Sequence, residues 1–145
     1  AMGVNIDGVV FGAHAALPAL RERGGGSIVA TASLAGLTSV PYEPIYAANK
    51  HAVVGLARSL GPSLALESIF FNAVCPGFAE TNIIATTREG ILASGIPIIP
   101  PQKVADTVVE LFSSEAAGEC WFVQAGREPA AFNFRGIPGP RADES

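Results

Sequence analysis

The stretch SIVATASLAGLTSVPYEPIYAANKHAVVGLARSL (residues 27–60) decides the fold, because it has the pattern of a strand, a loop and a long helix. The segment 27–33 is short, contains β-branched residues and is continuous in its apolar character. This pattern is typical of a strand buried on both faces of a parallel sheet. Small and turn-forming residues follow as far as Pro44. A helix is then predicted from about residue 45 to residue 60 or beyond, with Gly61-Pro62 disturbing its end.

The same alternation continues on both sides of this stretch. SIFFNAV (68–74) has the pattern of a second buried strand, QKVADTVVELFSS (102–114) that of an amphipathic helix, and ECWFVQA (119–125) that of a third strand. Apolar positions at helical spacing predict a first helix over residues 4–23. Strands that alternate with helices predict an α/β fold: a partial Rossmann-like, doubly wound parallel sheet of about three strands with three main helices.

Charge and composition narrow the class of function. The net charge is −4 and the basic residues are scattered singly, which argues against binding of nucleic acid or of an anionic membrane surface. The chain is 49% hydrophobic and 15% charged, so its elements are buried on both faces or meet another subunit. No apolar run reaches the length of a membrane span and no signal peptide is recognisable, which predicts a cytoplasmic protein.

The potential metal ligands are dispersed. Cys75 and Cys120 lie far apart without a Cys-x-x-Cys spacing, and they are expected to be buried free thiols in a reducing compartment. His14 and His51 lack ligand partners at suitable spacing, and no pair of carboxylates suggests a site. The sequence therefore predicts no metal centre.

Polar residues gather at one predicted edge of the sheet. In an open α/β sheet, ligands bind outside the carboxyl ends of the strands. Ser33 ends the first strand, residues 76–81 follow the second, and Tyr46 and Lys50 lie on the first turns of the helix that rises from the same edge. We expect them to converge on one pocket, with the segment 78–101, which has no clear period, as its lid.

The pair Tyr46 and Lys50 suggests acid–base chemistry. A free tyrosine has a pKa near 10, but a lysine four residues later on the same helix face, with Cβ atoms about 5–6 Å away, favours the phenolate. An oxidised nicotinamide ring would supply a second positive charge, and the Ser33 hydroxyl could hold a substrate oxygen. Such a group could take a proton from an alcohol or return one to a carbonyl. Taken alone, the pair would be better explained as two ordinary solvated side chains on a helix surface.

Together these residues resemble the short-chain dehydrogenase/reductase family. YAANK matches the Tyr-x-x-x-Lys motif of that family, and Ser33 stands thirteen positions before Tyr46, as the catalytic serine of the family does. VNIDGVV resembles the helix start that carries its catalytic asparagine, here Asn5. FNAVCPGFAETNI resembles the strand and Pro-Gly turn that contact the nicotinamide. The resemblance runs from the first residues to about Gly126.

The resemblance implies an oxidoreductase that transfers hydride between NAD or NADP and a small alcohol or carbonyl substrate. Tyr46 would be the general acid/base, and Lys50 would bind the nicotinamide ribose and lower the pKa of Tyr46. Ser33 would orient the substrate oxygen, and Asn5 would support a proton relay through water. The residues implied in cofactor binding are Tyr46, Lys50, Pro76, Gly77, Phe78 and Thr81.

The glycine-rich dinucleotide turn of that family has no counterpart, because Gly24–Gly26 precedes a strand and forms a loop. Residues 1–135 are therefore predicted to be the C-terminal part of an NAD(P)-binding domain whose dinucleotide-binding half is absent, with 136–145 as a flexible tail. The alternative is a truncated, non-catalytic module that acts only by dimerising. In both cases helices 4–23 and 45–66, which resemble the dimer-forming helices of the family, predict a homo-oligomer.

Overall fold

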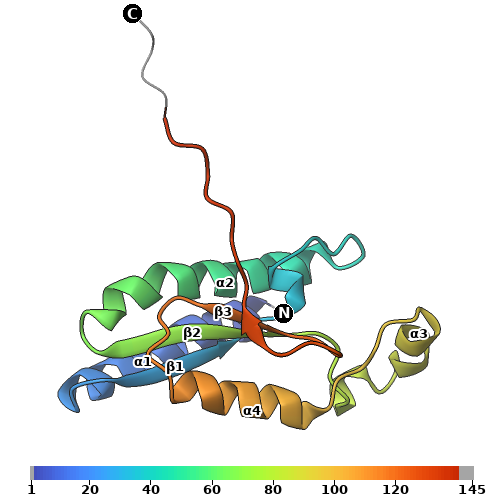
Figure 1. Cartoon of the computed structure of the whole chain (residues 1–145), viewed down its shortest axis with the longest axis horizontal. Coiled ribbons are helices and arrows are strands. Elements are labelled where there is room, and N and C mark those ends of the chain that lie inside the picture. The colour runs from blue at the N-terminus through green and yellow to red at the C-terminus, as the bar shows by residue number, and fades with distance from the viewer. Residues whose placement is uncertain (1, 141–145) are drawn as a thin grey trace, which may run out of the picture.

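A sheet with the strand order β1-β2-β3-β4 organises the computed structural model, which describes residues 2–140 (Figure 1). Strands β1 (Gly26–Thr31), β2 (Ile69–Pro76) and β3 (Cys120–Val123) are parallel, which confirms the predicted three parallel strands. Strand β4 (Ala130–Ala131) runs antiparallel to β3 and was not predicted. Two residues are too few to show the alternation that identifies a strand in a sequence.

The main helices lie on both faces of the sheet (Figure 1). Helix α2 (Pro44–Ala65) covers one face and α4 (Pro101–Phe112) the other, while α1 (Gly8–Glu22) packs on the same side as α2. A π-helical turn, η1 (Gly3–Asp7), precedes α1, where the sequence predicted one continuous helix. The three predicted helices are therefore present, and their order around the sheet is that of an α/β fold.

The alternation of side chains along β2 divides the core between the two faces. Ile69, Phe71, Ala73 and Cys75 point to the α2 face and are fully buried, because successive side chains of a strand alternate between its faces. Val74 points to the opposite face, where it packs with Leu111 of α4 and with Ile99 and Val123.

The predicted disturbance of α2 at Gly61-Pro62 is wrong, because the helix continues to Ala65. A Cβ atom at Gly61 would lie 2.1 Å from the backbone nitrogen of Gly118 and 2.8 Å from the backbone oxygen of Phe71. The missing side chain therefore permits α2 to approach the sheet and the loop before β3, and it does not end the helix.

The segment after β2 contains short elements that showed no period in the sequence. They are a 3₁₀ turn, η3 (Asn82–Ile84), and the helix α3 (Arg88–Ala93). A bridge between Ala79 and Ile99 closes the base of the segment, because the Ile99 N–H donates to Phe78 O at 2.8 Å and the Glu80 N–H to Ile99 O at 3.0 Å. The segment is thus a closed loop anchored at the end of β2.

The two ends of the chain bear on two expectations from the sequence, a missing membrane span and a flexible tail. The helical stretch Gly3–Glu22 is long and apolar enough to cross a membrane, so the expectation that no apolar run reaches that length is wrong. One such helix is weak evidence for a membrane span, because helices of soluble proteins can pass the same test. In the predicted tail, residues 136–140 form no helix or strand, and residues 141–145 lie outside the described part of the chain.

Candidate active site

Helix α2 places Tyr46 and Lys50 one turn apart near its start. Pro44 opens the helix at a position where the missing N–H of proline is no loss. The Lys50 Nζ lies 5.7 Å from the centre of the Tyr46 ring, within the range of a cation–π contact. Tyr46 is half-buried and Lys50 is buried, so these two residues do not form an ordinary solvated surface pair.

Lys50 is held at the carboxyl end of β1. Its Nζ donates a hydrogen bond to the backbone oxygen of Thr31 at 3.0 Å, and the residue is only 7% exposed. Burial lowers the pKa of Lys50, and the nearby Cys75 acts in the opposite direction. The hydrogen bond fixes the amino group between helix and sheet.

Ser33 begins the loop that follows β1. It is the N-cap of a 3₁₀ turn, η2 (Leu34–Gly36), and its Oγ accepts a hydrogen bond from the Ala35 N–H at 3.1 Å. The turn is pressed against α2, because a Cβ atom at Gly36 would lie 2.6 Å from the backbone oxygen of Lys50. Ser33 is thus positioned by a turn that itself contacts the Lys50 backbone.

Asn5 lies in the π-helical turn η1, half-buried beside the open edge of β1. It lines a cavity of about 380 Å³ together with Thr31 and Lys50. The rest of the lining is Val4, Gly8, Val9, Gly12, Ala13, Ile28, Val29 and Ala30. Single π-helical turns occur frequently at functional sites, and here the turn brings Asn5 to the cavity that Lys50 also lines.

The turn after β2 lies close in space to the loop that carries Ser33. The Gly77 N–H donates to Val123 O at 3.0 Å, and a Cβ atom at Gly77 would lie 3.2 Å from Cδ1 of Leu34, the residue after Ser33. Phe78 is 42% exposed. Pro76 and Gly77 therefore border the loop that carries Ser33, while Phe78 extends outward.

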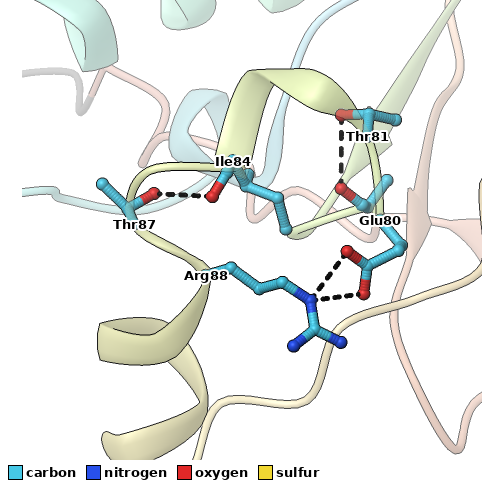
Figure 2. Close-up of polar contacts among 6 residues, drawn as sticks. Glu80, Thr81, Ile84, Thr87 and Arg88 are labelled. Carbon is cyan, nitrogen blue, oxygen red and sulfur yellow. Dashed lines mark hydrogen bonds and ion pairs between the residues drawn. The ribbon is translucent and has the colours of Figure 1, made fainter.

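Thr81 lies in the closed loop. Its hydroxyl donates to Ala79 O at 3.3 Å and the residue is exposed. Figure 2 shows the Arg88 side chain reaching back to both oxygens of the Glu80 carboxylate, at 2.8 and 3.0 Å. Arg88 lowers the pKa of Glu80, chiefly through this hydrogen bond. The ion pair joins the start of α3 to the residue that follows the Ala79–Ile99 bridge.

The structure therefore brings the predicted residues together in two groups. Lys50 and Asn5 share a cavity, and the turn bearing Ser33 contacts both the Lys50 backbone and Gly77. Within residues 2–140, no hydrogen bond joins the side chains of Ser33, Tyr46 and Lys50 to one another. Among the described residues, the Thr81 side chain makes only the local hydrogen bond to Ala79 O.

Sequence reasoning missed two parts of this site. The first is the Thr31 carbonyl, which no side-chain pattern can reveal because it is a backbone atom. The second is Cys75, which lies on the strand beneath Ser33. Its pKa is raised by a hydrogen bond with Cys120 and by burial, whereas the Ser33 backbone and Lys50 act in the opposite direction. Cys75 and Cys120 are both free and buried, as predicted.

Known proteins of similar sequence and structure are dehydrogenases and reductases. A family model described as short chain dehydrogenase matches residues 1–91. Cyclohexanol dehydrogenase from Acinetobacter sp. is 37% identical over 117 residues, which are 79% of this chain and 47% of that protein. Human 15-hydroxyprostaglandin dehydrogenase (NAD(+)) is 37% identical over 91 residues, which are 59% of this chain and 34% of that protein.

Solved structures agree with these matches. A gluconate 5-dehydrogenase from Burkholderia cenocepacia, in complex with NADP and tartrate, is 26% identical with a TM-score of 0.77. The superposition covers 86% of this chain and 53% of that one. The chain thus spans about half the length of the relatives it matches. Both NAD and NADP are named for these relatives, which is the cofactor class expected from the sequence. With the predicted fold and the family model in agreement, the chain belongs to the short chain dehydrogenase family.

Proposed function

We propose that this chain is the catalytic part of an oxidoreductase that transfers hydride between NAD or NADP and a small alcohol or carbonyl. The observation that carries the proposal is the arrangement around Lys50. Its Nζ is bound to Thr31 O, lies beside the Tyr46 ring, and lines the same cavity as Asn5. A buried ammonium next to a half-buried tyrosine is the arrangement that stabilises a phenolate.

In the proposed reaction, Tyr46 is the general acid/base. Its phenolate accepts the hydroxyl proton when an alcohol is oxidised, and its phenol returns a proton to the oxygen when a carbonyl is reduced. The positive charge of Lys50 lies beside the Tyr46 ring, where it can stabilise negative charge that develops on the tyrosine during the transfer. Ser33 holds the substrate oxygen by a hydrogen bond, since its Oγ accepts from the Ala35 N–H and keeps its own hydrogen for another partner.

The nicotinamide supplies or accepts the hydride when it is bound. The residues after β2 fit such a planar group: Gly77 presents backbone without a side chain, and Phe78 offers an exposed aromatic ring. We infer that Pro76, Gly77, Phe78 and Thr81 line its pocket and that Lys50 also binds its ribose. Asn5, at the cavity shared with Lys50, supports proton exchange with water.

We also propose that the protein works in the cytoplasm as a homo-oligomer assembled through η1, α1 and α2. An apolar groove of about 330 Å³ runs between these helices, lined by Ile6, Val9, Val10, Ala52, Val53, Gly55, Leu56 and Ser59. Phe11 on α1 is 69% exposed and adds apolar surface to this side of the molecule.

A second candidate function is a non-catalytic module that only dimerises. The apolar groove between α1 and α2 favours it, because a second copy of the chain could cover such a surface. The two candidates differ in cofactor binding, which a dimerising module does not require.

The test compares Tyr46→Phe with Tyr42→Phe in the protein as its gene encodes it. Tyr42 is 97% exposed in the loop before α2 and serves as the matched control. We expect Tyr46→Phe to reduce turnover at least about a hundredfold, the usual contribution of acid–base catalysis, with cofactor binding nearly unchanged. Tyr42→Phe should retain full turnover, measured by nicotinamide absorbance with a panel of small alcohols and ketones.

Retained turnover in Tyr46→Phe would refute the assigned role of Tyr46. A wild-type protein that binds neither NAD nor NADP in calorimetry would instead favour the non-catalytic module.

A further inference from the structure

Asn49 carries a buried polar atom that the proposed reaction does not use. The residue is 3% exposed and lies in α2 between Tyr46 and Lys50. Its Nδ2 is buried and has no hydrogen-bond partner among residues 2–140. Turning the amide over would exchange donor and acceptor, but it would still leave one polar atom buried at the same point.

Asn49 faces the π-helical turn that carries Asn5. Residues three and four positions apart share a helix flank, so Asn49 lies on the flank of Ala52 and Val53. Ala52 and Val53 line the groove against Ile6 and the residues that follow it, and η1 packs directly against α2. Asn49 therefore lies on the same flank of α2 as Ala52 and Val53, one turn closer to the start of the helix. This places it at the level of Tyr46 and Lys50.

An unpaired buried amide is costly, and asparagine is also a poor residue for a helix interior. A leucine has nearly the same shape and would remove both penalties, as the apolar side chains further along this flank do. Buried polar groups of this kind need an explanation, such as a bound water or a role in the site. The position between the two proposed catalytic residues of α2 favours a role in the site.

We propose that Asn49 is a positioning residue: its amide N–H holds one bound water between α2 and the η1 turn. That water fixes the Asn5 turn relative to Tyr46 and Lys50. Water is the smallest group that can satisfy a buried amide, and the η1 turn that packs against α2 would have to supply its second polar partner. This inference rests on the proposed function for its effect on turnover, but not for the bound water.

The test uses Asn49→Leu and Asn49→Ser in the protein as its gene encodes it, with Ala48→Leu on the exposed side of the same turn as control. Asn49→Leu should melt at the same temperature as the wild type or up to roughly 4 °C higher. Its kcat/KM should fall about tenfold, with a shifted pH profile, because the positioning contact is lost. Asn49→Ser, which keeps a donor, should recover part of the loss, and Ala48→Leu should change neither quantity.

The water itself is tested without turnover. The side-chain amide resonances of Asn49, identified by their absence in Asn49→Ser, should show magnetisation transfer from a long-lived water. Absence of that transfer overturns the proposal, and so does Asn49→Leu with unchanged kcat/KM and pH profile. If the wild type shows the bound water but no turnover with any alcohol or ketone, the proposed function fails and the water site stands.

Discussion

At the scale of single residues, Lys50 shows how a charged side chain is kept inside the fold. Its amino group gives up water for one hydrogen bond to Thr31 O, and this burial lowers its pKa below the usual 10.5. The folded state therefore holds the proton less firmly than the unfolded state. The catalytic proposal rests on the position of this amino group, which lies 5.7 Å from the centre of the Tyr46 ring.

The lowered pKa of Lys50 makes a prediction about stability. At pH values between the pKa of Lys50 in the folded state and 10.5, the unfolded chain binds more protons than the folded chain does. The contribution of Lys50 to the free energy of unfolding therefore rises with pH in this range. The wild type should thus gain stability relative to Lys50→Met as the pH is raised from 7 towards about 10. Urea unfolding of both proteins at several pH values measures the difference, and a difference that falls with pH would contradict the cause assigned here.

At the scale of elements, the contact between η2 and α2 joins Ser33 to Lys50. Gly36 has no room for a side chain against the Lys50 backbone, whereas Gly90, exposed in helix α3, has nothing within 4 Å of its Cβ position. Gly36→Ala should therefore destabilise the protein by about 1–3 kcal/mol through overpacking. Gly90→Ala should stabilise it by about 0.5–1 kcal/mol, because alanine is the better helix former.

Urea unfolding with both alanine variants checks this prediction. Equal effects of the two substitutions would show that η2 is not pressed against α2 as described.

The helices and strands also show which features of the structure could be predicted from the sequence. The period of apolar residues predicted β1, β2, β3 and the three main helices, because each is long enough to repeat a pattern and buries a face. The pair Tyr46 and Lys50 was predictable because four residues make one helical turn. The roles of Gly36 and Gly61 were not, since each depends on a backbone that lies near only after folding. The burial of the Asn49 amide without a hydrogen-bond partner could not be predicted for the same reason.

At the scale of the whole molecule, large apolar side chains are exposed on both sides of the sheet. The groove between α1 and α2 is apolar, and Phe11 of α1 is 69% exposed. Val109, which is 64% exposed, lies on α4 at the opposite face of the sheet. If the proposed oligomer forms through α1 and α2, a charge at Phe11 must be buried in the contact, and a charge at Val109 need not be.

Phe11→Glu should therefore dissociate the oligomer, and Val109→Glu should leave it intact. Light scattering after size-exclusion chromatography measures both masses. An oligomer that survives Phe11→Glu, or one that Val109→Glu disrupts, would exclude the proposed contact.

The bridge between Ala79 and Ile99 has a consequence for how this protein could diversify. Because the two ends of the loop are tied to each other, the length of chain between them is nearly independent of the sheet. Each doubling of a flexible loop costs only about 0.6 kcal/mol in closure entropy. Insertions, deletions or an exchanged segment between residues 82 and 98 should thus be tolerated, and this part of the loop can change while Thr81 and the residues on β1 and α2 stay the same.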